Sequence, residues 1–235
     1  MKTIALPYHT SFVEVHVDEK NLKKVICART DECQEEKSEA ELVKSALESP
    51  FGTPRLRELA KGKRKVTLVT SDHTRSVPSK ITLPILLEEI RKGNPDVDIT
   101  ILIATGLHRA TTKEEQRKMF GSEIVETEKI VVHDAFAENA CAFVRVLPSG
   151  AELWVNRLAL ECDLLVTEGF IEPHFFAGFS GGRKSILPGI CNAATVNENH
   201  SYRAIASPYA MAGVLERNPI HEDMVCAARS VNVQF

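Results

Sequence analysis

The sequence has no long apolar run, because nowhere in its 235 residues do about 18 apolar residues follow one another. Near the start, only Ile4, Ala5 and Leu6 precede Pro7, and this run is too short for the core of a signal peptide. A helix that spans a membrane needs about 20 apolar residues. We therefore expect no membrane partner and a cytoplasmic location.

Cysteine is also sparse, and no two of the six cysteines form a C-x-x-C pair. A chain of this size does not need disulfides to stabilise its core, so we expect reduced thiols. Lys and Arg number 29 against 32 Asp and Glu, which gives a formal net charge of -3. Without a basic block, nucleic acid is not an expected partner. Hydrophobic residues make up 43% of the chain, enough for the sizeable core of an ordinary globular protein.

Segments typical of strands and of helices alternate along most of the chain. Apolar runs predict buried strands at 65–70, 97–104, 130–133 and 164–167. Amphipathic stretches predict helices at 36–47, 79–92 and 113–120. The first 35 residues instead alternate apolar and polar positions, which predicts short antiparallel strands, one of them at 25–28. The fold class that follows is α/β: a mostly parallel, Rossmann-like sheet flanked by helices, with a short β-rich N-terminal segment.

The last residues read as the beginning of another element. After Pro219, a helix-like stretch leads into the run 231–235, which predicts a strand that is just starting. We therefore interpret the chain as a fragment of a longer protein.

Polar clusters follow the predicted strands, and in parallel sheets ligands bind beyond the carboxyl ends of the strands. Histidines follow strand ends or lie in a glycine-rich stretch at positions 73, 108, 133, 174 and 200. A single histidine of this kind is more often structural, but several at one edge favour acid–base catalysis or metal binding. No H-E-x-x-H pair is present, so zinc-protease chemistry is not expected.

The densest motif runs from Glu168 to Gly189. Its glycines 178, 181 and 182 allow a close backbone approach to an anion, and Arg183 and Lys184 supply charge, which predicts a phosphate cradle. The alternative is a glycine turn packed against a neighbouring strand. A Walker A loop that starts at Gly178 needs glycine where Arg183 stands, which argues against an ATP-dependent kinase or NTPase. Spacing alone leaves Lys184 either a desolvated nucleophile or a phosphate-binding lysine.

Five motifs together resemble the nickel-dependent lactate racemase family over nearly the whole chain. They are S-D-H-T-R at 71–75, A-T-G-L-H-R at 104–109, H-D-A at 133–135, E-P-H-F-F-A-G-F-S-G-G-R-K-S at 172–185 and N-E-N-H at 197–200. The long glycine-rich motif is highly specific, whereas each short one is weak by itself. The resemblance implies that residues 1–235 are the N-terminal cofactor-binding domain, and that a second α/β domain follows it in the family and closes the cleft.

The resemblance also implies a function, a cofactor and roles for single residues. Members of the family racemise or epimerise a 2-hydroxy acid, such as lactate, by proton-coupled hydride transfer to a nickel-pincer nucleotide. The roles it implies are acid–base catalysis by His108 and His174, covalent attachment at Lys184, nickel ligation by His200, and contact with cofactor and substrate by Asp72 and Arg75.

Two kinds of partner follow from the resemblance: the small 2-hydroxy-acid substrate, and the accessory enzymes that make the cofactor and meet the protein transiently. Two histidines suit this chemistry, because each hand of the substrate needs its own acid–base group. The alternative function is a non-catalytic domain that binds a nucleotide or cofactor without turnover. The presence of both His108 and His174 argues against that alternative.

Overall fold

The structure is a computed structural model that describes residues 1–27, 29, 32–33 and 35–235. It divides into two compact units, Met1–Ser38 and Glu39–Phe235. The first unit holds an antiparallel hairpin of β1 (Lys2–Tyr8) and β2 (Ser11–Val17), as the alternating pattern predicts. The predicted strand at 25–28 is wrong for residues 25–27, which have no regular structure, and residue 28 lies outside the described residues.

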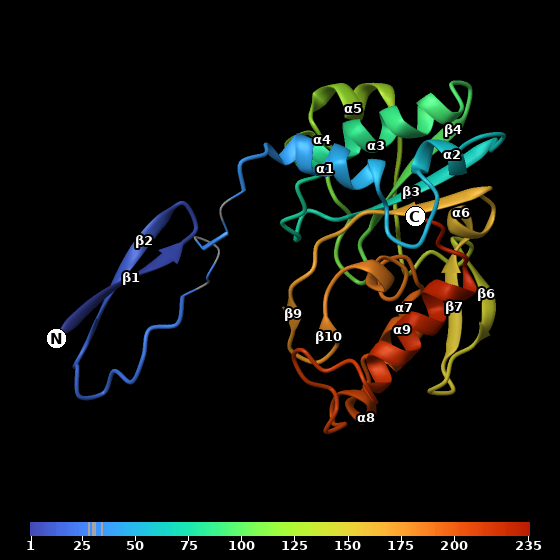
Figure 1. Ribbon diagram of the computed structural model, residues 1–235. Helices are drawn as coiled ribbons and strands as arrows, with labels where there is room; N and C mark the ends of the chain where they lie inside the picture. Colours follow the sequence, from blue (N-terminus) through green and yellow to red (C-terminus); the bar gives the residue numbers. More distant parts are fainter. Residues whose placement is uncertain (28, 30–31, 34) are drawn as a thin grey trace. The chain divides into compact units, whose positions relative to one another are not determined.

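The second unit is built around a parallel sheet of four strands in the order β5-β4-β3-β8 (Figure 1). The strands are β3 (Lys65–Ser71), β4 (Asp98–Ala104), β5 (Lys129–Val132) and β8 (Leu164–Thr167). Each coincides with a predicted strand to within about one residue, so the α/β fold class with its parallel sheet is confirmed. The predicted strand at 231–235 is not regular, yet its end lies beside β8: Gln234 N donates to Leu165 O, and Thr167 N donates to Phe235 O.

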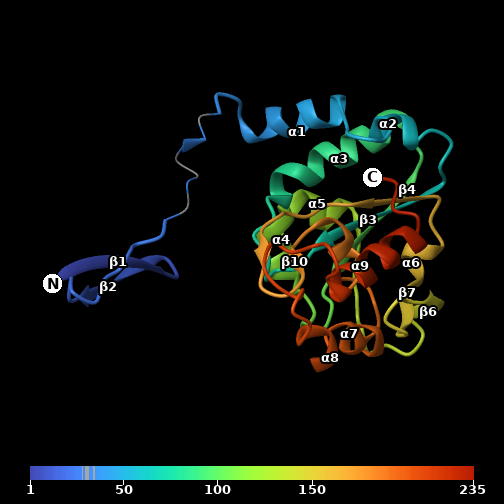
Figure 2. The same ribbon diagram turned by 60° about the horizontal axis from the view of Figure 1, so that its bottom comes forward.

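Helices α1 to α5 lie on one side of this sheet (Figures 1 and 2). They are α1 (Glu39–Glu48), α2 (Leu56–Leu59), α3 (Ser79–Gly93), α4 (Lys113–Phe120) and α5 (Ser122–Thr127). Leu83 and Ile90 of α3 are fully buried in one apolar cluster with strand residues such as Ile101. The predicted cap of α4 is present as a capping box between Thr112 and Glu115.

The chain after β5 covers the other side of the sheet (Figure 2). It forms β6 (Cys141–Val146), β7 (Glu152–Asn156), α6 (Arg157–Leu160), β9 (Pro173–His174), β10 (Gly178–Phe179), the 3₁₀ turn η2 (Gly182–Ser185), α7 (Ala193–Asn199), α8 (Tyr202–Ile205) and α9 (Pro219–Ser230). A second apolar cluster joins this layer to the sheet through Leu102 and Leu165, which pack with Ile186, Leu187 and Met224. None of the helices in the described ranges has the length and apolar character needed to cross a membrane.

This arrangement determines where the site lies. The strands are parallel, so the loops after β3, β4 and β8 emerge at the same edge of the sheet. The loop after β4 is fastened to the chain after η2, because Gly106 N donates to Gly189 O at 2.9 Å. Polar side chains from distant parts of the sequence therefore meet at this edge.

Candidate active site

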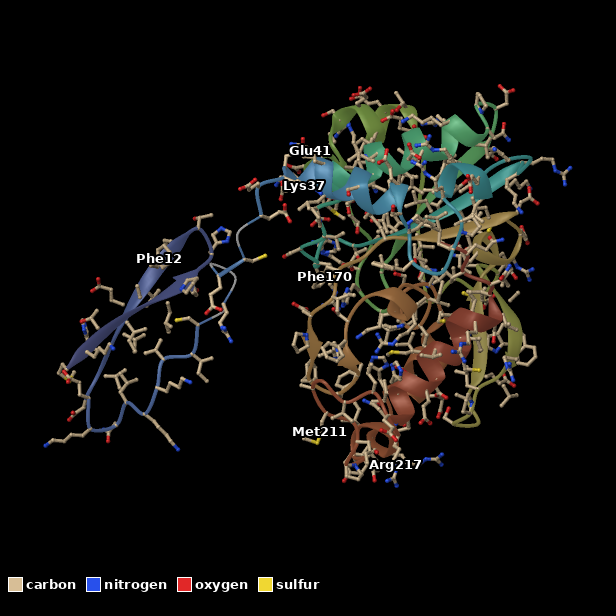
Figure 3. All side chains as sticks on the ribbon, viewed as in Figure 1. Phe12, Lys37, Glu41, Phe170, Met211 and Arg217 are labelled. Atoms are coloured by element: carbon tan, nitrogen blue, oxygen red, sulfur yellow. The ribbon has the colours of Figure 1, made fainter. Side chains whose placement is uncertain are left out.

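A cavity of about 370 Å³ lies at the carboxyl edge of the sheet. It is lined by the loops that follow β3, β4 and β8, together with η2 and the end of α7; Figure 3 labels Phe170, which lines the cavity from the loop after β8. The predicted site residues that line it are Asp72, Arg75, His108, His174, Gly181, Lys184 and His200. Gly178 and Gly182, the other two predicted residues, are not part of this lining.

Asp72 and His108 form a close pair on two neighbouring loops. His108 Nδ1 lies 2.6 Å from Oδ2 of Asp72, a side chain that is only 2% exposed. Oδ1 of Asp72 accepts from Thr74 N at 3.0 Å and from Thr74 Oγ1 at 2.7 Å. An ionised carboxylate only accepts hydrogen bonds, so His108 Nδ1 carries a proton and Nε2 is left as the basic nitrogen.

His174 lies on β9 and is held by its own loop. Its Nδ1 accepts weakly from the backbone nitrogens of Phe176 at 3.4 Å and Ala177 at 3.3 Å. The ring stacks on Phe175 at a centroid distance of 4.7 Å and meets the edge of Phe176 at 4.5 Å. Burial, and then the charge of Lys184, lower the pKa of His174 to about 4. The imidazole is therefore neutral at physiological pH.

Lys184, on η2, is partly buried, and its Nζ lies 6.0 Å from the ring centre of Phe176. Burial lowers the pKa of Lys184 to about 8, with help from the nearby charges of Arg75 and Arg183. About a tenth of the amine is then unprotonated at pH 7, far more than for a lysine with the ordinary pKa, and the unprotonated amine is the nucleophile. This environment favours the nucleophile over the plain phosphate-binding lysine.

His200 terminates α7 and presents its ring edge to Phe176 at a centroid distance of 5.1 Å. Burial, and then the charge of Lys184, lower the pKa of His200 to about 4, so the ring is neutral, the form that binds metals. Its Nδ1 is buried and has no hydrogen-bond partner in the described part of the chain. The same part contains no group of three or more His, Cys, Asp or Glu residues that could hold a metal ion, so a metal here needs ligands from another source.

Arg75 supplies a cation to the cavity. Its backbone nitrogen donates to Asp72 O at 3.1 Å, which fixes the loop, whereas its guanidinium makes no hydrogen bond or ion pair with any residue that the structure describes. A guanidinium with free N–H groups suits a carboxylate or a phosphate.

The three predicted glycines differ in what surrounds them. Gly181 has φ +76°, and a Cβ on it would lie 2.5 Å from Phe170 O, so only glycine fits this wall of the cavity. Gly178 has φ +79°, and its Cβ would lie 2.4 Å from Val214 O, so here the structure supports the packing alternative. Gly182 has φ +51° with no atom within 4 Å of its Cβ position.

Two of the candidate histidines lie outside this cavity. His133 is buried, accepts from Asn156 Nδ2 at 3.0 Å and donates from Nε2 to Cys191 O at 2.9 Å, which makes it structural. His73 Nδ1 lies 3.1 Å from Thr111 Oγ1.

The sequence did not single out Phe176, which lines the cavity, or Glu168, which lies directly before the lining residue Gly169. Phe176 touches His174, His200 and Lys184, and its place in an aromatic pair within the glycine-rich motif was the available signal. The buried carboxylate of Glu168 accepts hydrogen bonds from the hydroxyls of Thr70, Ser79 and Thr82. Its position directly after β8 was the corresponding signal.

Comparisons with known proteins agree with this picture. The family model described as the lactate racemase N-terminal domain matches residues 8–213. The lactate racemase of Thermoanaerobacterium thermosaccharolyticum is 50% identical over 235 residues, which are 100% of this chain and 55% of that protein. The lactate racemase of Lactiplantibacillus plantarum is 45% identical over the same shares.

Two solved structures are similar to the fold of this chain. The lactate racemase apoprotein from T. thermosaccharolyticum superposes with a TM-score of 0.91 at 50% identity and covers 99% of this chain and 54% of that chain. A crystal structure of a protein from Thermotoga maritima, at 24% identity and a TM-score of 0.64, covers 82% of this chain and 46% of that one and shows likeness of fold alone. The chain thus spans about half the length of the curated relatives that it matches.

Proposed function

The chain belongs to the family of the lactate racemase N-terminal domain, and on that premise we propose that it is the cofactor-binding part of an enzyme that interconverts the enantiomers of lactate or of a related 2-hydroxy acid. The observation that carries the proposal is the cavity that brings His108, His174, Lys184 and His200 together. The relatives extend well beyond the matched region, so we propose that residues 1–235 act as an N-terminal domain and that a second domain completes the cleft.

The residues of the cavity fit a nickel-pincer nucleotide. Lys184 offers an amine whose pKa of about 8 suits covalent attachment to one arm of the cofactor. His200 offers a neutral imidazole, and its partnerless Nδ1 shows that this nitrogen is not used by the described part of the fold. Nickel would take its remaining ligands from the cofactor, in agreement with the absence of a cluster of metal-binding residues among those described. When bound, the cofactor would supply an acceptor for the hydride on carbon 2 of the substrate, which makes that carbon planar and open to return from either face.

His108 is set as the base for one hand of the substrate. Since Asp72 holds the proton of Nδ1, Nε2 can take the hydroxyl proton of a 2-hydroxy acid and later return it. The ion pair with the buried carboxylate also stabilises the imidazolium that forms. Thr74 keeps the carboxylate in position through two hydrogen bonds.

His174, which lines the same cavity from β9, would serve the other hand of the substrate. Its neutral form at physiological pH can exchange a proton with the hydroxyl group, and Phe175 and Phe176 fix its ring plane. The free guanidinium of Arg75 would hold the substrate carboxylate or the cofactor phosphate.

The test is to produce the protein at the full length of its relatives together with the accessory enzymes that make the cofactor. Intact mass, peptide mapping and metal analysis should show a nucleotide adduct on Lys184 and about one nickel per chain, and the product should interconvert D- and L-lactate. Lys184→Arg should abolish all three results, whereas Lys118→Arg on the exposed face of α4 should leave them unchanged. An unmodified Lys184 in cells with an active pathway would refute the proposal and favour the non-catalytic cofactor-binding domain.

A further inference from the structure

The guanidinium of Arg183 is surrounded by carbonyl oxygens of its own loop. Nη2 donates to Ala177 O at 2.9 Å and to Phe179 O at 3.0 Å. Nη1 donates to Gly181 O at 3.3 Å and to Ser180 O at 3.4 Å. Residues 177–181 thus turn four carbonyl groups toward one cation.

These contacts use every N–H group on the two terminal nitrogens of Arg183, since each Nη carries two. The remaining nitrogen, Nε, is buried without a partner, and no carboxylate among the described residues pairs with this guanidinium. The side chain therefore has no terminal donor left for a ligand. Arg183 therefore supplies positive charge to this region, as its place in the motif predicts, without a terminal N–H group left for an anion.

The loop that Arg183 holds connects two residues of the cavity, because β9 with His174 precedes it and η2 with Lys184 follows it. Its shape depends on left-handed backbone at Gly178 and Gly181. Four carbonyl dipoles that converge within such a short segment repel one another unless donors bind them. Two of the four also accept a backbone N–H, Ala177 O from Phe179 N at 3.0 Å and Gly181 O from Lys184 N at 3.1 Å, and Arg183 donates to all four. A planar fork with several donors can satisfy all of them at once, whereas a lysine ammonium has only three donors and no fork.

The outer side of the loop is fastened separately. Asn218, the N-cap of α9, donates from Nδ2 to Phe176 O at 2.9 Å and to Val214 O at 3.0 Å. Ser180 fastens the loop to the preceding segment, since its Oγ donates to Phe170 O at 3.1 Å. Arg183 is thus the group that organises the inner side of the loop, directly before Lys184.

We propose that Arg183 is a positioning residue: its fork holds loop 177–181 in the shape that presents Lys184 to the cavity, and it does not bind the ligand itself. This inference rests on the proposed function only in that Lys184 is the attachment point. The fork, and not merely the positive charge, is the feature that the geometry requires.

The first test needs no variant. In the cofactor-free protein with ¹⁵N-labelled arginine, the Nη protons of Arg183 should give separate, slowly exchanging NMR signals, because each is held by a carbonyl. Arg203 is exposed and makes one hydrogen bond, from Nη2 to Ser149 O at 3.3 Å. The signals of its Nη protons should therefore merge into an average and exchange quickly with water. Rapidly averaged signals for Arg183 would overturn the proposal.

The second test separates fork from charge with Arg183→Lys, and Arg203→Lys is the matched control. Deuterium exchange of the amides in 177–182 should be about tenfold faster in Arg183→Lys and unchanged in the control. Pyridoxal 5′-phosphate followed by borohydride should label Lys184 preferentially in the parent protein. In Arg183→Lys, the reagent should no longer label Lys184 in preference to other lysines. A cooperative unfolding transition in urea should show that this variant is folded.

The outcomes of the second test distinguish a positioning role of Arg183 from the alternatives. Exchange and labelling equal to those of the parent protein would mean that charge alone suffices, and this would overturn the proposal. Normal exchange with reduced labelling would mean direct contact between Arg183 and the probe, and this would overturn it too. If the proposed function fails instead, full-length protein will carry an unmodified Lys184 while the exchange and NMR results stand.

Discussion

Asp72→Asn is the substitution that tests the acid–base chemistry most directly. Oδ1 of Asp72 accepts from the backbone and hydroxyl of Thr74, and both of these donors stay in the variant. The oxygen of the introduced amide must therefore remain on that side, and the amide NH₂ group must take the place of Oδ2 opposite His108. An NH₂ group can only donate, so Nδ1 of His108 loses its proton, and the neutral ring carries that proton on Nε2 instead. Nε2 of His108, the nitrogen proposed to take the substrate proton, then carries a proton and can no longer act as a base.

The magnitude follows from the interaction that is lost. A hydrogen bond of 2.6 Å to a buried carboxylate contributes about 1.5–3 kcal/mol, which corresponds to about 10- to 150-fold in rate. The wrong tautomer adds to this loss, since replacing the aspartate of a serine-protease triad by asparagine lowers kcat by about 10⁴-fold. We therefore expect the kcat of lactate racemisation to fall by about 10²- to 10⁴-fold with little change in KM.

The assay is the initial rate in both directions on cofactor-loaded, full-length enzyme, with ¹⁵N NMR of the His108 tautomer in cofactor-free protein as a readout that does not depend on turnover. Thr74→Val is the control: it removes one donor to Asp72 and the long 3.3 Å contact between Thr74 Oγ1 and His108 Nδ1, but it keeps the carboxylate, so we expect a loss in kcat of less than about tenfold. A kcat for Asp72→Asn within about threefold of the parent value, or an Nδ1–H tautomer that survives the change, would refute the reasoning.

Further predictions concern the amine of the cavity, its glycines and the carboxylate behind it. The rate of acetic anhydride labelling at Lys184, followed by peptide mapping, should rise as the pH passes about 8; a midpoint near 10.5, the ordinary pKa of a lysine, would contradict its desolvation. Gly178→Ala should lower the free energy of unfolding in urea by at least about 2 kcal/mol, because the added Cβ meets Val214 O in a left-handed conformation. Gly182→Ala has an open Cβ position and should cost only about 1 kcal/mol, so equal losses would count against the packing argument. Glu168→Leu leaves three hydroxyls without their acceptor and should cost about 2–4 kcal/mol; a urea midpoint that does not change would show that the hydroxyls find other partners.

The sequence was sufficient for the sheet because the central strands are buried on both faces. Residues 66–70 and 99–103 are each five consecutive buried positions filled by Val, Ile, Leu and Thr, and such runs identify strands of a parallel sheet without any knowledge of their neighbours. The hairpin of β6 and β7 was not predicted, although Leu153 and Val155 are buried at alternate positions and a turn at Pro148 precedes them. The pattern was present, but it is short and interrupted by a register shift between Phe143 and Arg145.

The residue types of the site were predictable, but their pairings were not. Asp72 and His108 are 36 positions apart, and they meet only because β3 and β4 are adjacent and end at one edge. The role of Arg183 was invisible for a different reason: its partners are backbone carbonyls, which every residue has, so the identities of residues 177–181 give no sign of it. Interactions with the backbone depend on the conformation of the loop, and that conformation emerges only with the fold.

Burial and the charges of the cavity together lower the pKa values of His174 and Lys184 in the cofactor-free protein. His174 is depressed first by burial and then by the cation of Lys184, and Lys184 is in turn depressed by burial, Arg75 and Arg183. Attachment of a cofactor through the amine of Lys184 would remove that cation, and a phosphate or carboxylate near Arg75 would offset another. Both changes would raise the pKa of His174 above about 4, because they weaken the contribution of charge while burial, the larger cause, remains. The same cations that add to the effect of burial on the lysine before attachment therefore also add to the effect of burial that keeps His174 neutral.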